Sequence, residues 1–198
     1  MKHYEAELPE GYVLSEHINA NNKIFGLVMN IIAFAVTAAI TALAFVLLGT
    51  QGREIGFDLT KLSLGMIVFA GAMFLYIVLH ELTHGAAYKA LTGQKLTFGL
   101  TLYVAFCGVP SIYVRRGASL VALTSPLILF TLVLGGLSAL MWFIEPLYFI
   151  LSALLFGLHL GGCSGDIYMT ALLLFKYRDG DILIRDTGPE QFIYTKAL

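Results

Sequence analysis

Four long apolar segments dominate the sequence and restrict the structures that the chain can form. The first, residues 24–49, contains no charged residue and is long enough to cross a bilayer with some tilt. The others cover residues 62–92, residues 118–142, and a stretch from just after Pro146 to about residue 175. Hydrophobic residues make up 58% of the chain, above the roughly 45–50% of soluble domains. We therefore expect an all-α membrane protein, a bundle of about four transmembrane helices.

A segment of different composition separates the second and third apolar segments. Residues 95–116 are rich in β-branched and aromatic side chains, and Gly108 and Pro110 interrupt them. This pattern predicts a β-hairpin or strand pair. Its apolar content favours a hairpin associated with the membrane, where irregular backbone must pack against protein or line a cavity.

The organisation predicted along the chain is one polytopic membrane domain, residues 1–198. A polar N-terminal segment (1–23), a membrane core (24–176) and a charged tail (177–198) make it up. The first residues lack the pattern of a signal peptide. Basic residues are concentrated in the segments that share a side with the N-terminus, which predicts that both termini are cytoplasmic. They are Lys2, Lys23, Lys89, Lys95, Arg115, Arg116, Lys176, Arg178, Arg185 and Lys196, against Arg53 and Lys61 on the other side.

The five residues HELTH, from His80 to His84, carry the strongest chemical signal. On a helix, residues four apart share a face, so the two imidazoles can converge on one Zn²⁺ ion. Zinc with three protein ligands leaves a position to water and lowers the pKa of that water to about 7. Glu81 is placed to take a proton from the water as it attacks a carbonyl, and to pass it to the leaving amine. The sequence therefore predicts His80 and His84 as metal ligands and Glu81 as the catalytic base.

A third ligand is required, and two residues of the fourth segment are candidates. Asp166 is favoured, because it lies about 19 residues into its segment and His80 about 18 into its own, at nearly equal depth given a rise of roughly 1.5 Å per residue. Asp166 could instead cap a helix that restarts at Ile167. His159, two turns earlier, is the rival ligand, although a lone histidine on an apolar face is more often a hydrogen-bonded core residue.

The motifs resemble those of site-two-protease-like intramembrane metalloproteases, in which an aspartate of a later helix completes a zinc site begun by HExxH. They are closer still to a small family of bacterial membrane zincin peptidases that share HELxHG and a later Gly-Ser-x-Gly-Asp-like motif. HELTHG (80–85) matches the first element and GCSGD (162–166) the second. The resemblance covers roughly residues 62–175. It implies a bacterial cytoplasmic membrane location and supports Asp166 as the third ligand.

The function expected from these features is zinc-dependent hydrolysis of a peptide bond in a membrane-embedded or membrane-proximal substrate. One alternative is a catalytically silent metal-binding scaffold or regulator, although such a protein has no use for Glu81 as a base. A metal hydrolase of a non-peptide bond is the other, because the motif specifies an activated water and not the substrate. The lipid bilayer is an expected partner. A net charge of −1 without a basic cluster argues against nucleic acid.

Overall fold

A computed structural model of the protein describes residues 3–56, 58–101, 104–178 and 181–197. Lys2, one of the basic residues counted above, lies outside these ranges. The described residues include four helical stretches that are long and apolar enough to cross a membrane, as the sequence predicted. They are α1 (Lys23–Thr50), α2 (Leu59–Thr92), α3 (Arg116–Ile144) and a stretch from Pro146 to Lys176. The last comprises α4 (Pro146–Gly162), α5 (Ser164–Ala171) and a π-helical turn, η1 (Leu172–Lys176).

A two-stranded hairpin lies between α2 and α3, which confirms that part of the prediction. Strand β3 (Thr97–Leu100) pairs antiparallel with β4 (Ala105–Gly108), with Thr97 opposite Gly108. Phe98 and Leu100 of β3 are exposed large apolar side chains. The hairpin therefore presents apolar surface, as its composition predicted.

The prediction of an all-α protein, in contrast, was incomplete. The two ends of the chain and one strand from its middle form a five-stranded sheet. Its strand order is β1-β5-β6-β7-β2, and every neighbouring pair is antiparallel. The expected polar N-terminal segment and tail supply four of these strands, and residues 113–115, assigned above to the hairpin region, supply the fifth. The strands are β1 (Tyr4–Glu5), β2 (Tyr12–Asn19), β5 (Tyr113–Arg115), β6 (Ile182–Asp186) and β7 (Glu190–Lys196).

The chain divides into two compact units. Unit 1 comprises residues 1–28, 79–126 and 165–198, and unit 2 comprises residues 29–78 and 127–164. Within unit 1 the apolar side of the sheet packs on α5 and η1, where Ile182, Ile184 and Ile193 cluster with Met169 and Leu173. Unit 1 therefore has a mixed α/β core of its own.

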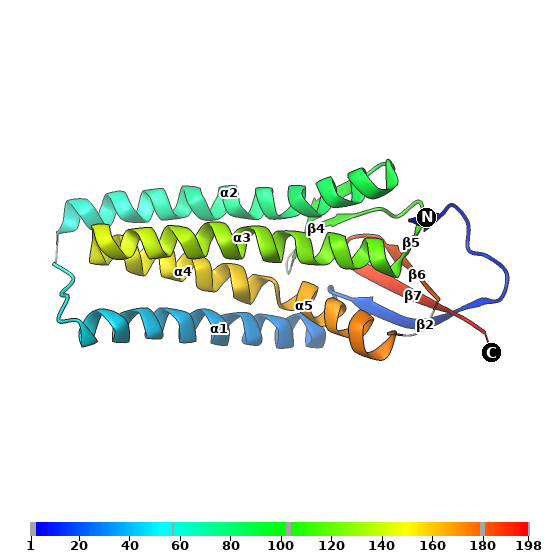
Figure 1. Cartoon of the computed structure of the whole chain (residues 1–198), viewed down its shortest axis with the longest axis horizontal. Helices are drawn as coiled ribbons and strands as arrows, with labels where there is room; N and C mark the ends of the chain where they lie inside the picture. The colour runs from blue at the N-terminus through cyan, green and yellow to red at the C-terminus, as the bar shows by residue number, and fades with distance from the viewer. Residues whose placement is uncertain (1–2, 57, 102–103, 179–180, 198) are drawn as a thin grey trace. The chain divides into compact units, whose positions relative to one another are not determined.

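Unit 2 consists of four helical segments that run side by side (Figure 1). Helices α1 and α4 approach closely where Gly157 and Gly161 of α4 face Thr37 and Ala33 of α1. Two small residues spaced four apart on each helix allow this contact, as in membrane helix pairs generally.

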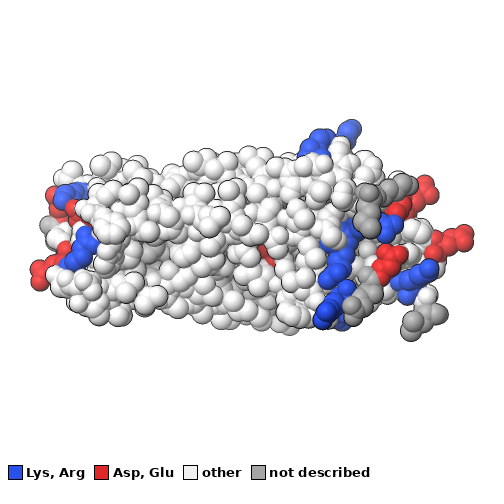
Figure 2. Space-filling view, viewed as in Figure 1, with Lys and Arg blue, Asp and Glu red and all other residues white. Residues whose placement is uncertain are grey.

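Charged side chains are distributed unevenly on the surface (Figure 2). In unit 2 they gather at the loop between α1 and α2 and at Glu145, where Lys61 pairs with Glu145 at 3.3 Å. In unit 1 they gather around the sheet, while on the face drawn in Figure 2 the helical surface of both units is almost free of them. Many large apolar side chains of the helices are exposed, including Phe34, Ile67, Phe74 and Leu132. An apolar helical surface of this kind suits contact with lipid.

Candidate metal centre

His80 and His84 lie one turn apart on α2, on the same face of the helix. Both residues are buried, with 8% and 7% of their surface exposed. Their Nε2 atoms are 3.2 Å apart, so the two rings direct the same nitrogen toward one point. As the i, i+4 spacing predicted, the two imidazole rings lie on one helix face and converge.

Asp166 reaches the same point from the first turn of α5. Helix α4 ends at Gly162 and α5 begins at Ser164, so the glycine-rich stretch breaks the fourth segment just before Asp166. The Asp166 carboxylate places Oδ2 3.3 Å from His80 Nε2 and Oδ1 3.5 Å from His84 Nε2. The two histidines and the aspartate thus form one group, and all three belong to unit 1.

The spacing of these donor atoms fits a zinc ion. Zinc bonds of about 2.0–2.1 Å in a tetrahedral arrangement place neighbouring ligand atoms roughly 3.3 Å apart. The two Nε2 atoms are 3.2 Å apart, and each lies 3.3 or 3.5 Å from a different oxygen of the Asp166 carboxylate. Two imidazoles and one carboxylate are also a ligand set used by catalytic zinc sites. The group could therefore hold a zinc ion with little movement of its side chains.

The second nitrogen of His84 is fixed by helix α3. His84 Nδ1 lies 2.9 Å from the backbone carbonyl oxygen of Ala122. A carbonyl only accepts hydrogen bonds, so Nδ1 carries the proton and donates it. In the neutral ring Nε2 then has a free lone pair, which is the state that a metal requires. This contact was not expected from the sequence.

The hairpin packs against α2 directly after the motif. Gly85 follows His84, and a Cβ added at Gly85 would lie 2.7 Å from Cζ of Phe98 and 3.1 Å from Cδ1 of Leu96. A side chain at position 85 would therefore require the tips of the Phe98 and Leu96 side chains to shift. Glu81, one residue after His80, is partly buried on the same helix. The candidate base and the hairpin are therefore both next to the histidine pair.

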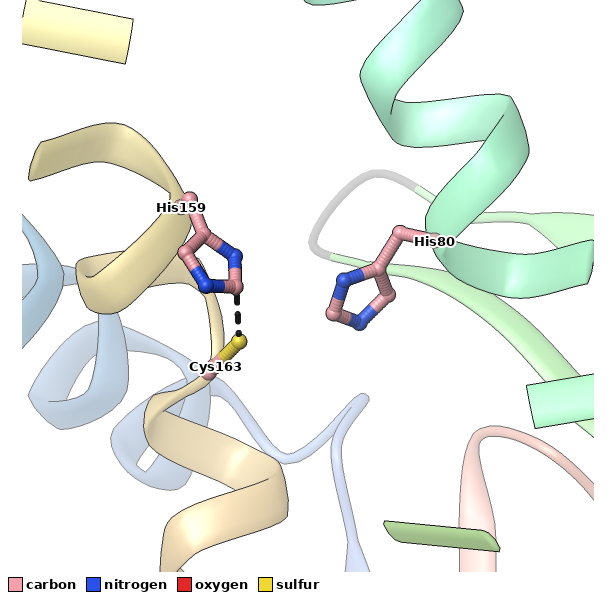
Figure 3. A group of neighbouring side chains, drawn as sticks. All are labelled: His80, His159 and Cys163. Atoms are coloured by element: carbon pink, nitrogen blue, oxygen red, sulfur yellow. Dashed lines mark hydrogen bonds between the residues drawn. The ribbon is translucent and has the colours of Figure 1, made fainter. Parts of the chain in front are cut away.

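His159, the rival ligand, lies in unit 2 and is fully buried there. Its Nδ1 is 3.0 Å from the Tyr76 hydroxyl and its Nε2 is 3.1 Å from the Thr131 hydroxyl. Figure 3 draws His159 with Cys163 one turn later, whose Sγ is 3.6 Å from Nδ1. His80, the third residue drawn, belongs to unit 1. Contacts at both ring nitrogens make His159 a link between α2, α3 and α4 within unit 2.

A buried carboxylate that was not predicted from the sequence lies next to Tyr88, one helical turn after the HELTH motif. Asp186, at the end of β6, accepts a hydrogen bond of 2.7 Å from the hydroxyl of Tyr88, one turn after His84. The backbone N–H of Gly188 donates to it at 2.8 Å. Burial raises the pKa of Asp186 to about 6, and burial together with nearby Asp186 raises the pKa of the Cys107 thiol to about 12. Cys107 is thus a protonated free thiol at neutral pH.

Four helical stretches of membrane-spanning length and a His–His–Asp group able to hold a metal define the general class: a helical membrane protein with a candidate metal site. The family model described as "Putative zincin peptidase" matches residues 73–180, more than half of the chain, and the chain belongs to this family. The matched region includes the HELTH helix, the hairpin and Asp166, and ends before Asp186. No match was found among curated proteins or among solved structures.

Proposed function

We propose that the protein is a zinc-dependent, site-two-protease-like endopeptidase that cleaves a peptide bond in a membrane-embedded or membrane-proximal substrate. The observation that carries this proposal is the pair of Nε2 atoms of His80 and His84, 3.2 Å apart, with the two oxygens of the Asp166 carboxylate 3.3 and 3.5 Å from them and Glu81 beside them. Membership of the zincin peptidase family supports it. Both termini would be cytoplasmic, in the cytoplasmic membrane of a bacterium.

In this proposal His80, His84 and Asp166 hold the ion through Nε2, Nε2 and a carboxylate oxygen. Bound zinc would supply a Lewis acid that lowers the pKa of a water molecule and polarises the substrate carbonyl. Glu81 would be the base that accepts a proton from water during attack on the carbonyl carbon. The same carboxyl group would donate that proton to the nitrogen of the leaving amine as the C–N bond breaks.

The hairpin is the proposed holder of the substrate. In the described part of the chain β3 has β4 on one side only, so its other edge can pair with an extended peptide. Such a peptide exposes its carbonyls, whereas a helical one keeps them in hydrogen bonds. A proline placed at Phe98 or Gly99 should stop cleavage of co-reconstituted single-span test proteins while zinc content stays unchanged. If these variants cleave as fast as wild type, the substrate is not held by strand addition to β3.

The test of the metal site is the zinc content of detergent-purified protein, measured by elemental analysis. Wild type should hold about one zinc per chain. His80→Ala, His84→Ala and Asp166→Asn should lose it, and Glu81→Gln should keep it while losing cleavage. His17→Ala and Asp181→Asn are the matched controls, because both residues lie on the exposed surface of unit 1.

Three results would change the assignment. Loss of zinc in His159→Ala, with retention in Asp166→Asn, would move the third ligand to His159. If wild type purified without chelator contains neither zinc nor another transition metal, the protein would be assigned as a scaffold or regulator and not as a peptidase. Zinc binding combined with hydrolysis of non-peptide esters only would favour the other hydrolase class.

A further inference from the structure

Pro126 lies inside helix α3, and its side chain is fully buried. Proline has no backbone N–H, and in an α-helix the N–H of residue 126 would bond to the carbonyl of residue 122. The carbonyl of Ala122 therefore lacks the hydrogen bond that residue 126 would donate in a regular α-helix. Because Ala122 is 1% exposed, water does not reach this position freely either.

Two side chains occupy the place of the missing N–H. The Ser125 hydroxyl donates to the Ala122 oxygen at 2.8 Å, and His84 Nδ1 donates to the same oxygen at 2.9 Å. A carbonyl oxygen has two lone pairs, so these two donors satisfy it fully. Pro126, Ser125 and Ala122 all belong to unit 1 with His84.

We propose that Pro126 is a positioning residue of the metal site: the carbonyl that it frees at Ala122 holds the proton of His84 on Nδ1 and keeps Nε2 available for the ion. The inference rests on the proposed function, because it concerns the same metal. Hydrogen bonds to the far nitrogen of a ligating histidine fix its tautomer and orientation. Here the acceptor is a backbone atom, and the residue that makes it available is the proline.

A purely architectural role of Pro126 makes the opposite prediction. Proline in a helix interior removes a hydrogen bond and strains the preceding turn. If Pro126 only shapes α3, Pro126→Ala should make the metal-free protein as stable or more stable and leave zinc affinity unchanged. In the proposed role the restored N–H at position 126 competes for the Ala122 oxygen, so zinc affinity falls although stability does not.

The experiment measures zinc affinity of detergent-purified full-length protein by competition with a chelating dye, for wild type, Pro126→Ala and Pro146→Ala. Pro146 is the matched control, because it lies in the first turn of α4, where an N–H has no helical partner. We expect zinc affinity to fall by about tenfold or more in Pro126→Ala, the range seen for lost hydrogen bonds to ligating residues. Pro146→Ala should bind zinc as wild type does.

A second measurement needs no variant of the proline and no metal. In ¹⁵N-histidine-labelled, zinc-free wild type, the neutral ring of His84, identified by its loss in His84→Gln, should carry its proton on Nδ1. A proton on Nε2 overturns the inference, as does unchanged zinc affinity in Pro126→Ala. Absence of zinc binding in wild type would instead refute the proposed function, while the tautomer measurement would still test the hydrogen bond from His84 to Ala122 on which the role of Pro126 depends.

Discussion

The hydroxyl of Tyr88 donates a hydrogen bond of 2.7 Å to the carboxylate of Asp186, and both side chains are 2% exposed. Tyr88 lies on α2 one turn after His84, whereas Asp186 ends strand β6, nearly a hundred residues later in the chain. The bond therefore attaches the sheet formed by the chain ends to the helix that carries the candidate metal ligands.

Tyr88→Phe should destabilise the protein, because it removes one donor from a buried carboxylate without opening the site to water. Leaving a buried polar group without its partner costs about 1–3 kcal/mol. Thermal unfolding in detergent measures the effect. Tyr113→Phe is the control, since the ring of Tyr113 packs edge-on against Tyr194 in the same sheet and the change leaves that contact in place. Equal unfolding temperatures for the two variants would show that the Tyr88 hydroxyl contributes nothing.

Asp186 should make stability depend on pH. Burial raises its pKa to about 6 in the folded protein, against about 3.9 in an unfolded chain. The folded state thus binds the proton more tightly than the unfolded state. Its contribution to stability is fully present below about pH 4 and is lost as the pH rises through about 6, by on the order of 3 kcal/mol.

Asp186→Asn tests this dependence, because the amide keeps an acceptor for Gly188 but cannot ionise. Unfolding temperatures recorded from about pH 4 to about pH 7, with chelator present so that zinc release does not contribute, should fall for wild type and stay nearly level for the variant. A parallel decline in both proteins would assign the pH dependence to other groups.

The sequence was sufficient to predict what depends on local pattern. The HELTH spacing on a helix appears in the structure where it was expected, whereas α5 begins at Ser164 and not at Ile167, so Asp166 lies in its first turn and does not cap it. Helical spacing fixes which residues share a face, and glycines fix where a helix can break. The hairpin also followed from composition, although residues 113–115 join the larger sheet instead.

The five-stranded sheet was missed because its pairings join distant parts of the chain. Tyr12 of β2 lies opposite Lys196 of β7, and no local period encodes such a contact. Strand β6 is buried on both faces over Ile182–Ile184, so it lacks the alternation that identifies a half-exposed strand. The His84–Ala122 contact had one readable signal, Pro126, since a proline frees the carbonyl four residues before it.

The contact between Gly85 and Phe98 should determine where the hairpin sits relative to the HELTH helix. In Gly85→Ala the new Cβ would lie 2.7 Å from the tip of the Phe98 ring, so the ring or the hairpin must move. We expect cleavage of a co-reconstituted test protein to fall by tenfold or more, since small displacements of a bound substrate reduce rates by about 10²-fold. Zinc content should be unchanged.

Phe98→Leu provides the rescue, because its shorter side chain leaves room for the added methyl group. Cleavage by the double variant Gly85→Ala/Phe98→Leu should be faster than by Gly85→Ala alone, a non-additive result expected for residues in contact. If the double variant is as slow as the sum of the two single effects predicts, the loss arises elsewhere than at this contact.

Gly161 should be intolerant of any side chain, because it sets the distance between α1 and α4 in unit 2. A Cβ at this position would lie 2.4 Å from the carbonyl oxygen of Ala33 and 2.9 Å from its Cα, and backbone atoms cannot rotate away. Gly161→Ala should therefore separate the helices and destabilise the protein by about 1–3 kcal/mol. Gly136→Ala is the matched control, because a Cβ there meets no atom within 4 Å and alanine favours a helix by about 1 kcal/mol. The two changes should shift the unfolding temperature in opposite directions, and a stabilising effect of Gly161→Ala would show that α1 and α4 are not held together by this contact.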